Sequence, residues 1–338
     1  MRTFALLCFT VFLTWIVGHD FHTPIQRWVD IGPGGKVVAC LSFLGFFAAP
    51  VYLLEWWMEW RQKLNPPWPL ALPKGVNRRM IVLSRSGTLR RIFRGLQLHR
   101  LYNAWLTMFP RIRSLPGSNV VYRARRTESV SLALEMLEGG NVYDGALLPA
   151  DFTTFADIGC NVGYFTCLLA HHAGGRPIKG LMVDANERVI KEAVWHANRN
   201  RLDVEALHGV VGSGALGPTA DFYLYQSDTC STAKPEARVA RQFKRITVPV
   251  LTLTEDWRRR FGSSRCHVLK VDIEGSELVF LQSEMEFLRR VDCIIIEWHS
   301  HRVSFEEVRA FLVGQGFQLI KIMDGTAAAD GTACFKRK

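Results

Sequence analysis

Two acidic residues stand two positions apart at the end of an apolar run in the stretch LKVDIEGSEL, residues 269–278. Asp272 and Glu274 follow a predicted β-strand, and since side chains alternate along a strand, both should point to the same side. Two like charges in a desolvated pocket raise the pKa of one of them, which suits a base that takes a proton from a hydroxyl near neutral pH. The spacing therefore predicts a general base, Asp272 or Glu274, at a strand end.

A second candidate base closes the next strand-like run, in IIIEWHSHR, residues 294–302. Neutral histidine is the commonest general base, and adjacent strand ends would bring His299 near Glu274. Another alternative is Mg²⁺ or Mn²⁺ held by Asp272, Glu274 and Glu297, although we favour a site without metal. A simpler interpretation also stays open: Asp272 only contacts a ligand, and Glu274 only accepts backbone amides where the following helix starts.

The stretch DIGCNVGYFT, residues 157–166, has the spacing of a ligand-binding turn. Gly159 and Gly163 let the backbone pass close to a ligand, and the helix that follows begins with free N–H groups. The spacing differs from the dinucleotide fingerprint G-x-G-x-x-G. Asp157, two positions before the first glycine of the turn, would suit a ligand with a cationic amino group better than a pyrophosphate.

A further acid, Asp184, ends the next strand-like run in VDAN, residues 183–186. A carboxylate at the end of the second strand of such a unit can accept hydrogen bonds from both ribose hydroxyls. An acid before the turn, the glycine turn and an acid after the second strand together indicate a pocket for S-adenosylmethionine (SAM).

The elements that must position these residues alternate between strand-like and helical patterns. The apolar strand-like runs are 155–159, 180–185, 204–211, 246–253, 267–273, 292–298, 317–323 and 332–338. The helical patterns include 164–173, 187–200, 276–290 and 304–316. Alternation of this kind predicts a mostly parallel sheet covered on both faces, with ligands at the carboxyl ends of its strands.

The motifs FADIGCNVGYFT, VDANERVIKEAVWHANRN, VPVLTLTEDW, LKVDIEGSELVFL and CIIIEWH occur in an order and spacing that resembles the FkbM family of SAM-dependent methyltransferases. The resemblance covers about residues 120–320. It implies a Rossmann-like class I methyltransferase fold, with a seven-stranded, mostly parallel sheet and an antiparallel last strand. It also implies methyl transfer to an oxygen, often a hydroxyl of a sugar or natural product. The candidate donor-binding residues are Asp157, Gly159, Cys160, Asn161, Gly163, Asp184 and Ala185.

The charge of the chain is uneven. The net charge is +11, and fifteen Lys and Arg with no Asp or Glu lie between Arg61 and Arg126. This stretch should face something anionic, phospholipid headgroups or an acidic substrate, whereas no nucleic-acid-binding motif accompanies it. The eight cysteines form no CxxC pair, which argues against a zinc site and a disulfide framework and favours a reducing compartment.

Two uncharged or nearly uncharged stretches, Phe4–Gly18 and Val37–Trp57, lie near the N-terminus. A helix needs about 20 apolar residues to cross a bilayer, so we expect a hairpin of two membrane helices. The basic residues that follow predict a cytoplasmic remainder of the chain. The expected organisation is an anchoring hairpin (1–64), a basic spacer with an amphipathic helix (65–119) and a SAM-dependent methyltransferase domain (120–338).

The hypothesis that follows is a membrane-tethered O-methyltransferase acting on a hydroxyl of a small molecule, a glycan or a lipid-linked acceptor at an anionic membrane surface. Two alternatives remain. A nucleic-acid methyltransferase would use the basic stretch to hold RNA, and a membrane scaffold would keep the fold without catalysis, because fold alone never fixes function.

Overall fold

The computed structural model describes residues 103–104, 106–137, 143–212, 217–224, 244–327 and 329–338. All of them belong to one compact unit, residues 77–338. The expected membrane hairpin and nearly all of the expected amphipathic helix, residues 86–106, lie outside the described residues. Within the described part of the chain, no helix combines the length and the apolar character needed to cross a lipid bilayer.

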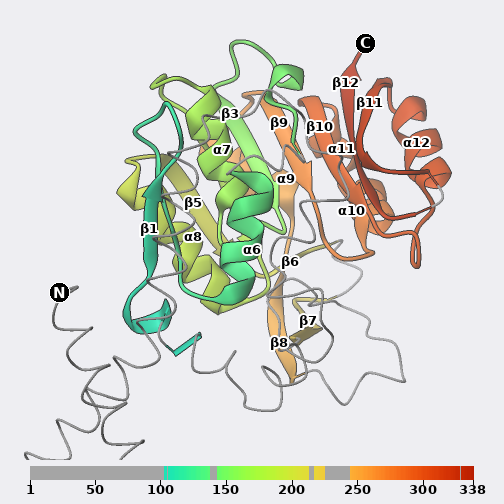
Figure 1. The fold of residues 1–338 in the computed structure, drawn as a ribbon. Coiled ribbons are helices and arrows are strands. Elements are labelled where there is room, and N and C mark those ends of the chain that lie inside the picture. The colour runs from blue at the N-terminus through green and yellow to red at the C-terminus, as the bar shows by residue number, and fades with distance from the viewer. Residues whose placement is uncertain (1–102, 105, 138–142, 213–216, 225–243, 328) are drawn as a thin grey trace, which may run out of the picture. The chain divides into compact units, whose positions relative to one another are not determined.

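A seven-stranded sheet forms the centre of the unit (Figure 1). Its strand order is β11-β12-β10-β9-β3-β4-β5, and β12 is antiparallel to both of its neighbours, whereas β10, β9, β3, β4 and β5 are parallel. The strands are β3 (Thr154–Ile158), β4 (Lys179–Asp184), β5 (Asp203–His208), β9 (Cys266–Val271), β10 (Val291–Trp298), β11 (Phe317–Gly325) and β12 (Gly331–Arg337). The mostly parallel sheet with a reversed last strand confirms the predicted class I methyltransferase fold.

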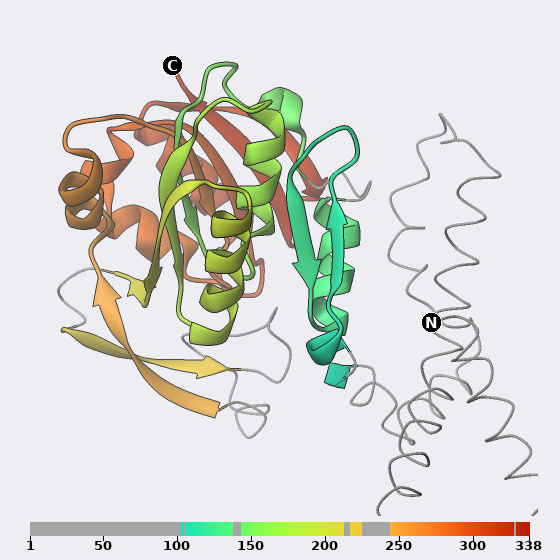
Figure 2. The same ribbon diagram turned by 90° about the vertical axis from the view of Figure 1, so that its left-hand side faces the viewer.

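Helices cover both faces of the sheet, as Figure 2 shows. One face carries α6 (Thr127–Met136), α7 (Tyr164–His172) and α8 (Glu187–Arg199), and the other carries α9 (Leu253–Phe261), α10 (Glu277–Ser283), α11 (Met285–Leu288) and α12 (Phe305–Gly314). A 3-10 turn, Gly145–Leu147, precedes β3. Alternate strand residues therefore pack into different cores on the two faces: Phe155 and Val268 on the α7 side, Ala156 and Leu269 on the α10 side.

Local sequence signals fix where several helices begin. Asn186 accepts the N–H of Arg188 at the start of α8, and Ser304 forms a reciprocal capping box with Glu307 at the start of α12. Helix α7 begins directly after Gly163, which has a left-handed backbone conformation. These starts place helix N-termini at the end of the sheet where the site lies.

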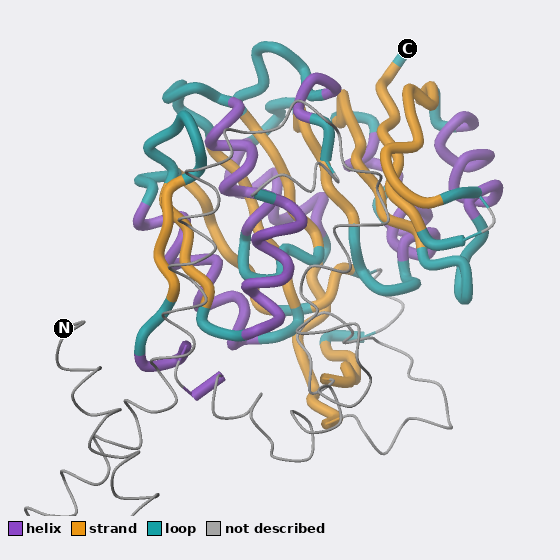
Figure 3. The backbone as a smooth tube through the Cα atoms, in the orientation of Figure 1, coloured by secondary structure: helices purple, strands orange, loops and turns teal. Residues whose placement is uncertain are grey.

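Two smaller sheets accompany the main one (Figure 3). Strands β1 (Arg111–Ser114) and β2 (Val121–Ala124) form an antiparallel pair, and β6 (Val210–Val211), β8 (Lys244–Leu251) and β7 (Thr219–Leu224) form a three-stranded sheet. The sequence placed the run 246–253 in the main sheet, which was wrong. In β8, exposed residues alternate with buried or partly buried ones, so only one face of the strand is covered.

Candidate active site

The carboxyl ends of β4, β3, β9 and β10 meet at one edge of the sheet because these strands are parallel neighbours. A cavity of about 890 Å³ opens there. Seven of the residues predicted from sequence line it: Gly159, Cys160, Asn161, Asp184, Ala185, Asp272 and Glu274. The other three, Asp157, Gly163 and His299, lie behind its wall.

The turn after β3 has the backbone conformation that its glycines allow. Gly159, Asn161 and Gly163 all have positive φ angles of 73°, 49° and 83°. A Cβ atom on Gly159 would overlap the carbonyl oxygen of Asp272, and one on Gly163 would press on Ala193 of α8. Glycine is therefore required at both positions, once for a close backbone approach and once for helix packing.

Asp184 is tied to this turn by its carboxylate. Its Oδ2 accepts the N–H of Asn161 (2.9 Å), and its Oδ1 accepts the N–H of Asn186 (2.8 Å). Burial raises the pKa of Asp184 to about 6, although both hydrogen bonds act in the opposite direction. The carboxylate faces the cavity with capacity for further hydrogen bonds, as an acid that binds ribose hydroxyls must.

Lys270 is a site residue that the sequence analysis missed. It is only 3% exposed, and its Nζ donates to the carbonyl oxygen of Gly159 (2.8 Å) and to Oδ2 of Asp272 (3.1 Å). Burial alone would lower the pKa of Lys270, but the charges of Asp272 and Asp157 outweigh it, and the pKa lies well above its usual value. The ammonium group therefore stays charged and joins the glycine turn to the end of β9.

Asp157 has a different place from the one expected. It is completely buried and does not line the cavity. Its Oδ2 accepts the hydroxyl of Thr166 (3.1 Å), and its Oδ1 lies 3.7 Å from Nζ of Lys270. The cationic partner that the sequence assigned to a ligand is thus the protein's own Lys270.

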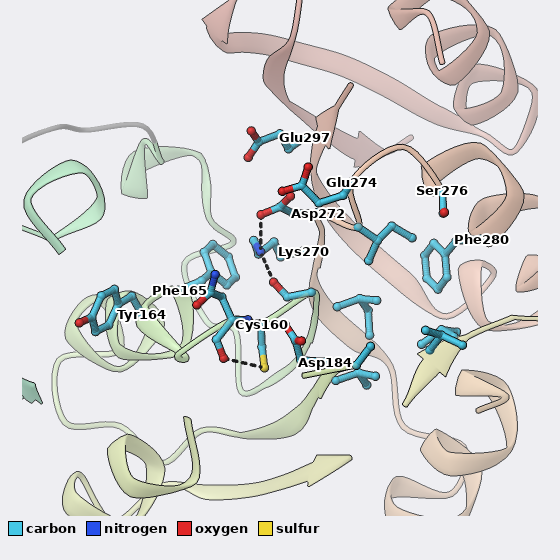
Figure 4. A pocket seen from close by; sticks show the side chains of 18 of the residues that line it. Cys160, Tyr164, Phe165, Asp184, Lys270, Asp272, Glu274, Ser276, Phe280 and Glu297 are labelled. Atoms are coloured by element: carbon cyan, nitrogen blue, oxygen red, sulfur yellow. Dashed lines mark hydrogen bonds and ion pairs between the residues drawn. The ribbon is translucent and has the colours of Figure 1, made fainter. Parts of the chain in front are cut away.

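Three carboxylates gather at the far end of the cavity from Asp184 and Cys160, with Lys270 between the two ends (Figure 4). They are Asp272, Glu274 and Glu297. Burial, followed by the charge of Asp272, raises the pKa of both Glu274 and Glu297 to about 8. Glu274 also has a positive φ of 54°, an uncommon backbone conformation for glutamate that occurs mostly at functional sites.

His299 lies behind Glu274 and contacts two glutamates. Its Nε2 is 3.4 Å from Oε2 of Glu274, and its Nδ1 is 2.9 Å from Oε1 of Glu277. Burial works against the charged form of His299, but the hydrogen bond to Glu277 and the charge of Glu274 outweigh it and raise its pKa to about 10. The predicted proximity of His299 and Glu274 is confirmed, and the two glutamates favour the charged form of the histidine.

The ligand atoms of Asp272, Glu274 and His299 lie within 4.8 Å of one another, a set that differs from the trio expected for a cation. Two of these groups already have charged partners of their own. Lys270 is bonded to Asp272, and His299 is bonded to Glu277. We therefore assign no metal here.

Residues 157–319 match the sequence model of the methyltransferase FkbM domain. They form an FkbM methyltransferase domain. The match includes the glycine turn, Asp184, Lys270 and the three carboxylates Asp272, Glu274 and Glu297. The methyl donor of the FkbM domain is SAM, and the turn with Asp184 is the part of the cavity whose chemistry suits it. Bound there, SAM supplies an electrophilic methyl group.

Solved structures similar to the chain include a methyltransferase FkbM from Methylobacillus flagellatus KT, with 13% identity over 58% of this chain and a TM-score of 0.40. The chain covers 47% of that protein. A SAM-dependent methyltransferase from Aquifex aeolicus has 15% identity over 60% of this chain and 91% of its own, with a TM-score of 0.34. M. jannaschii TYW2 in complex with AdoMet has 14% identity over 68% and 87%, with a TM-score of 0.35. No curated protein matches the chain.

Lys270 and Glu277 complete the FkbM site beyond the predicted residues, and Glu297 was predicted only as a possible cation ligand. Lys270 carried a usable signal, since it stands two positions before Asp272 in a strand and therefore on the same side. Glu277 carried no such signal, because an acid in the first turn of a helix is common. Its bond to His299 joins residues 22 positions apart on different elements, and no local pattern shows such a contact.

Proposed function

We propose that the FkbM domain transfers the methyl group of SAM to a hydroxyl oxygen. The observation that carries the proposal is the group of three carboxylates at the end of the cavity opposite the SAM turn. A hydroxyl is a weak nucleophile until a base removes its proton, and a base works best when its pKa lies near the operating pH. Glu274 lines the cavity and has a pKa of about 8.

The roles of the carboxylates differ. Asp272 is held by Lys270, so that its charge is already compensated. Glu274 has the strained backbone and the histidine behind it, and we assign it as the base that accepts the hydroxyl proton while the oxygen attacks the methyl group. Glu297 faces the same space from β10 and is placed to accept a hydrogen bond from the acceptor.

The charge of the cavity favours an uncharged acceptor over a phosphate-rich one. Besides the carboxylates above, Glu128, Glu135 and Asp221 line it, and among the lining residues of the described chain Lys270 is the one with a basic side chain. A nucleic-acid strand entering this cavity would meet like charge. A glycan, a lipid-linked molecule or another polyhydroxylated acceptor meets hydrogen-bond acceptors instead.

We further propose that the domain works at the cytoplasmic face of a membrane, with residues 1–64 as anchor, 65–119 as basic spacer and 120–338 as catalytic domain. The basic stretch ending at Arg126 supports this placement. In its described part, Met108, Phe109 and Ile112 are each more than half exposed beside Arg111 and Arg113. Apolar side chains among arginines suit an anionic lipid surface. Flotation of the full chain with vesicles of anionic and of neutral lipid tests this point separately.

The decisive experiment incubates the full chain and labelled SAM with possible acceptors in parallel reactions. The acceptors are fractionated membrane lipids, glycans and total RNA. Mass spectrometry then identifies the molecule that gains a methyl group. Methylation of a hydroxyl in the lipid or glycan fractions supports the proposal, and methylation of RNA alone contradicts it. Calorimetry with SAM comes first, because a chain that does not bind SAM would be a scaffold.

A further inference from the structure

Glu277 is the first residue of α10, where an acid is commonly found because it interacts well with the helix dipole. Such acids usually lie at the surface. Glu277 is instead completely buried. Its Oε1 accepts the backbone N–H of Gly275 (2.9 Å) and contacts Nδ1 of His299 (2.9 Å), while its Oε2 is buried without a hydrogen-bond partner among the described residues. A buried carboxylate in this position is costly unless a cation accompanies it.

The contacts of Glu277 determine which atom of His299 carries a hydrogen. Oε1 of Glu277 already accepts the Gly275 N–H, so it acts as an acceptor, and Nδ1 of His299 must be the donor. The remaining nitrogen, Nε2, is then directed to Glu274, 3.4 Å away. His299 itself does not line the cavity, whereas Glu274 does. The histidine can therefore act on the acceptor only through Glu274.

We propose that Glu277 is a positioning residue, which holds His299 as a fixed cation behind Glu274, the carboxylate that faces the acceptor. The inference rests on the proposed function for the role of Glu274, but the arrangement itself does not. Without the charge of Glu277, burial would favour neutral His299. A neutral imidazole no longer stabilises the ionised form of Glu274, and the base would hold its proton more tightly.

The other groups around His299 have also been considered. The ring of His301 lies 6.1 Å from that of His299. The charges of three further acids also reach His299, from the residue after β9, from β10 and from the turn before β12. They are Asp272, Glu297 and Asp330. Glu277 alone combines direct contact with Nδ1 and complete burial. It is therefore the group whose removal should change His299 most.

Glu277→Gln separates position from charge, because the amide oxygen can accept both hydrogen bonds while the charge is lost. The full chain, labelled with ¹⁵N-histidine, is titrated by NMR, and His299→Asn identifies the His299 signals. In the wild-type chain we expect His299 to carry both ring hydrogens at pH 8. In Glu277→Gln we expect His299 to lose one ring hydrogen at a pH that is roughly one unit or more below the wild-type value. Such a shift is a tenfold change in proton affinity.

Glu284→Gln is the matched control. Glu284 is buried almost as deeply (1% exposed), but its carboxylate accepts backbone N–H groups at the start of α9. This variant should leave the His299 titration unchanged. A neutral His299 at pH 7 in the wild type, or the same titration in Glu277→Gln and wild type, overturns the proposal. If Glu277→Gln does not fold, Glu274→Gln decides: His299 should stay charged at pH 8 through its Glu277 contact, and loss of that charge contradicts us.

The titration needs no acceptor, so its result is independent of whether a hydroxyl is methylated. Once an acceptor is known, Glu277→Gln should lower kcat at least tenfold while calorimetry shows the same affinity for SAM. A change in SAM affinity with kcat unaltered would show that Glu277 only supports the fold of the donor side. Failure of methylation with an intact His299 titration would count against the proposed function alone.

Discussion

The backbone of Gly159 lies directly against the backbone of Asp272, so that a side-chain carbon at Gly159 would overlap the Asp272 carbonyl oxygen. This approach joins the SAM-binding turn after β3 to the end of β9, where the acceptor chemistry is proposed. Lys270 strengthens the junction, since its Nζ bonds both residues. The two halves of the site are thus one structure, and several consequences can be measured.

Gly159→Ala should abolish measurable SAM binding, because the methyl group cannot be accommodated without moving β9 away from the turn. Isothermal calorimetry with SAM and a thermal melt provide the reading. Gly174→Ala is the matched control. Its φ of 61° is similar, but nothing lies within 4 Å of the added carbon, so only the backbone strain of about 1 kcal/mol remains. Equal SAM affinity in the two variants would contradict the required close approach.

Asp184→Ala should weaken SAM binding at least about tenfold, because a charge-assisted pair of hydrogen bonds to the ribose is lost. The variant also releases the N–H groups of Asn161 and Asn186, which loosens the turn. Asp184→Asn keeps one hydrogen-bond acceptor, so its SAM affinity should fall between those of the wild type and Asp184→Ala. An unchanged dissociation constant in Asp184→Ala, measured by calorimetry, would remove this end of the cavity from the SAM site.

Lys270→Met should destabilise the domain by about 3 kcal/mol, because removing one partner of a buried ion pair leaves the others uncompensated. Asp157 would be left fully buried beside an apolar chain. Urea unfolding measures the loss. Lys191→Met, which removes only an exposed pair with Glu187 on α8, should change stability by less than about 0.5 kcal/mol. Similar losses in both variants would show that the buried cation is not structural.

The rate of methyl transfer should rise with pH up to about 8. Glu274 must be ionised to accept a proton, and below its pKa of about 8 most of it is protonated. Glu274→Gln should lower kcat by about 100-fold or more, and His299→Ala should also mainly slow turnover. Glu297→Gln should retain the rise with pH. A flat pH profile in the wild type, or unchanged kinetics in Glu274→Gln and His299→Ala, would remove Glu274 as the base.

Structural features that depend on residues close together in the sequence were predictable. The glycine turn, the order of strands and helices and the acids at strand ends all follow from local pattern, and these determine the fold and one end of the cavity. The partner of Asp157 was not predictable in the same way. A buried carboxylate can have either of two cationic partners, the ammonium group of a bound ligand or a lysine of the protein. Only the register of β3 against β9, which pairs Asp157 with Lys270, shows that the partner is Lys270.

The role of Glu277 shows the same limit. Its position at a helix start gave a complete local explanation, and its actual partner comes from β10. The run 246–253 was misplaced because a strand with one covered face and a strand inside a parallel sheet can share the same β-branched composition. The expected membrane hairpin lies outside the described residues and stays a prediction.

The cavity has walls of two different origins. Its floor comes from the ends of central strands, whereas Ser131 and Glu135 of α6 and Phe222 of β7 close it from elements outside the main sheet. Substitutions on α6 and β7 can therefore change the shape of the acceptor space without displacing the carboxylates or the glycine turn. Diversification of this scaffold toward new acceptors should begin at those three positions.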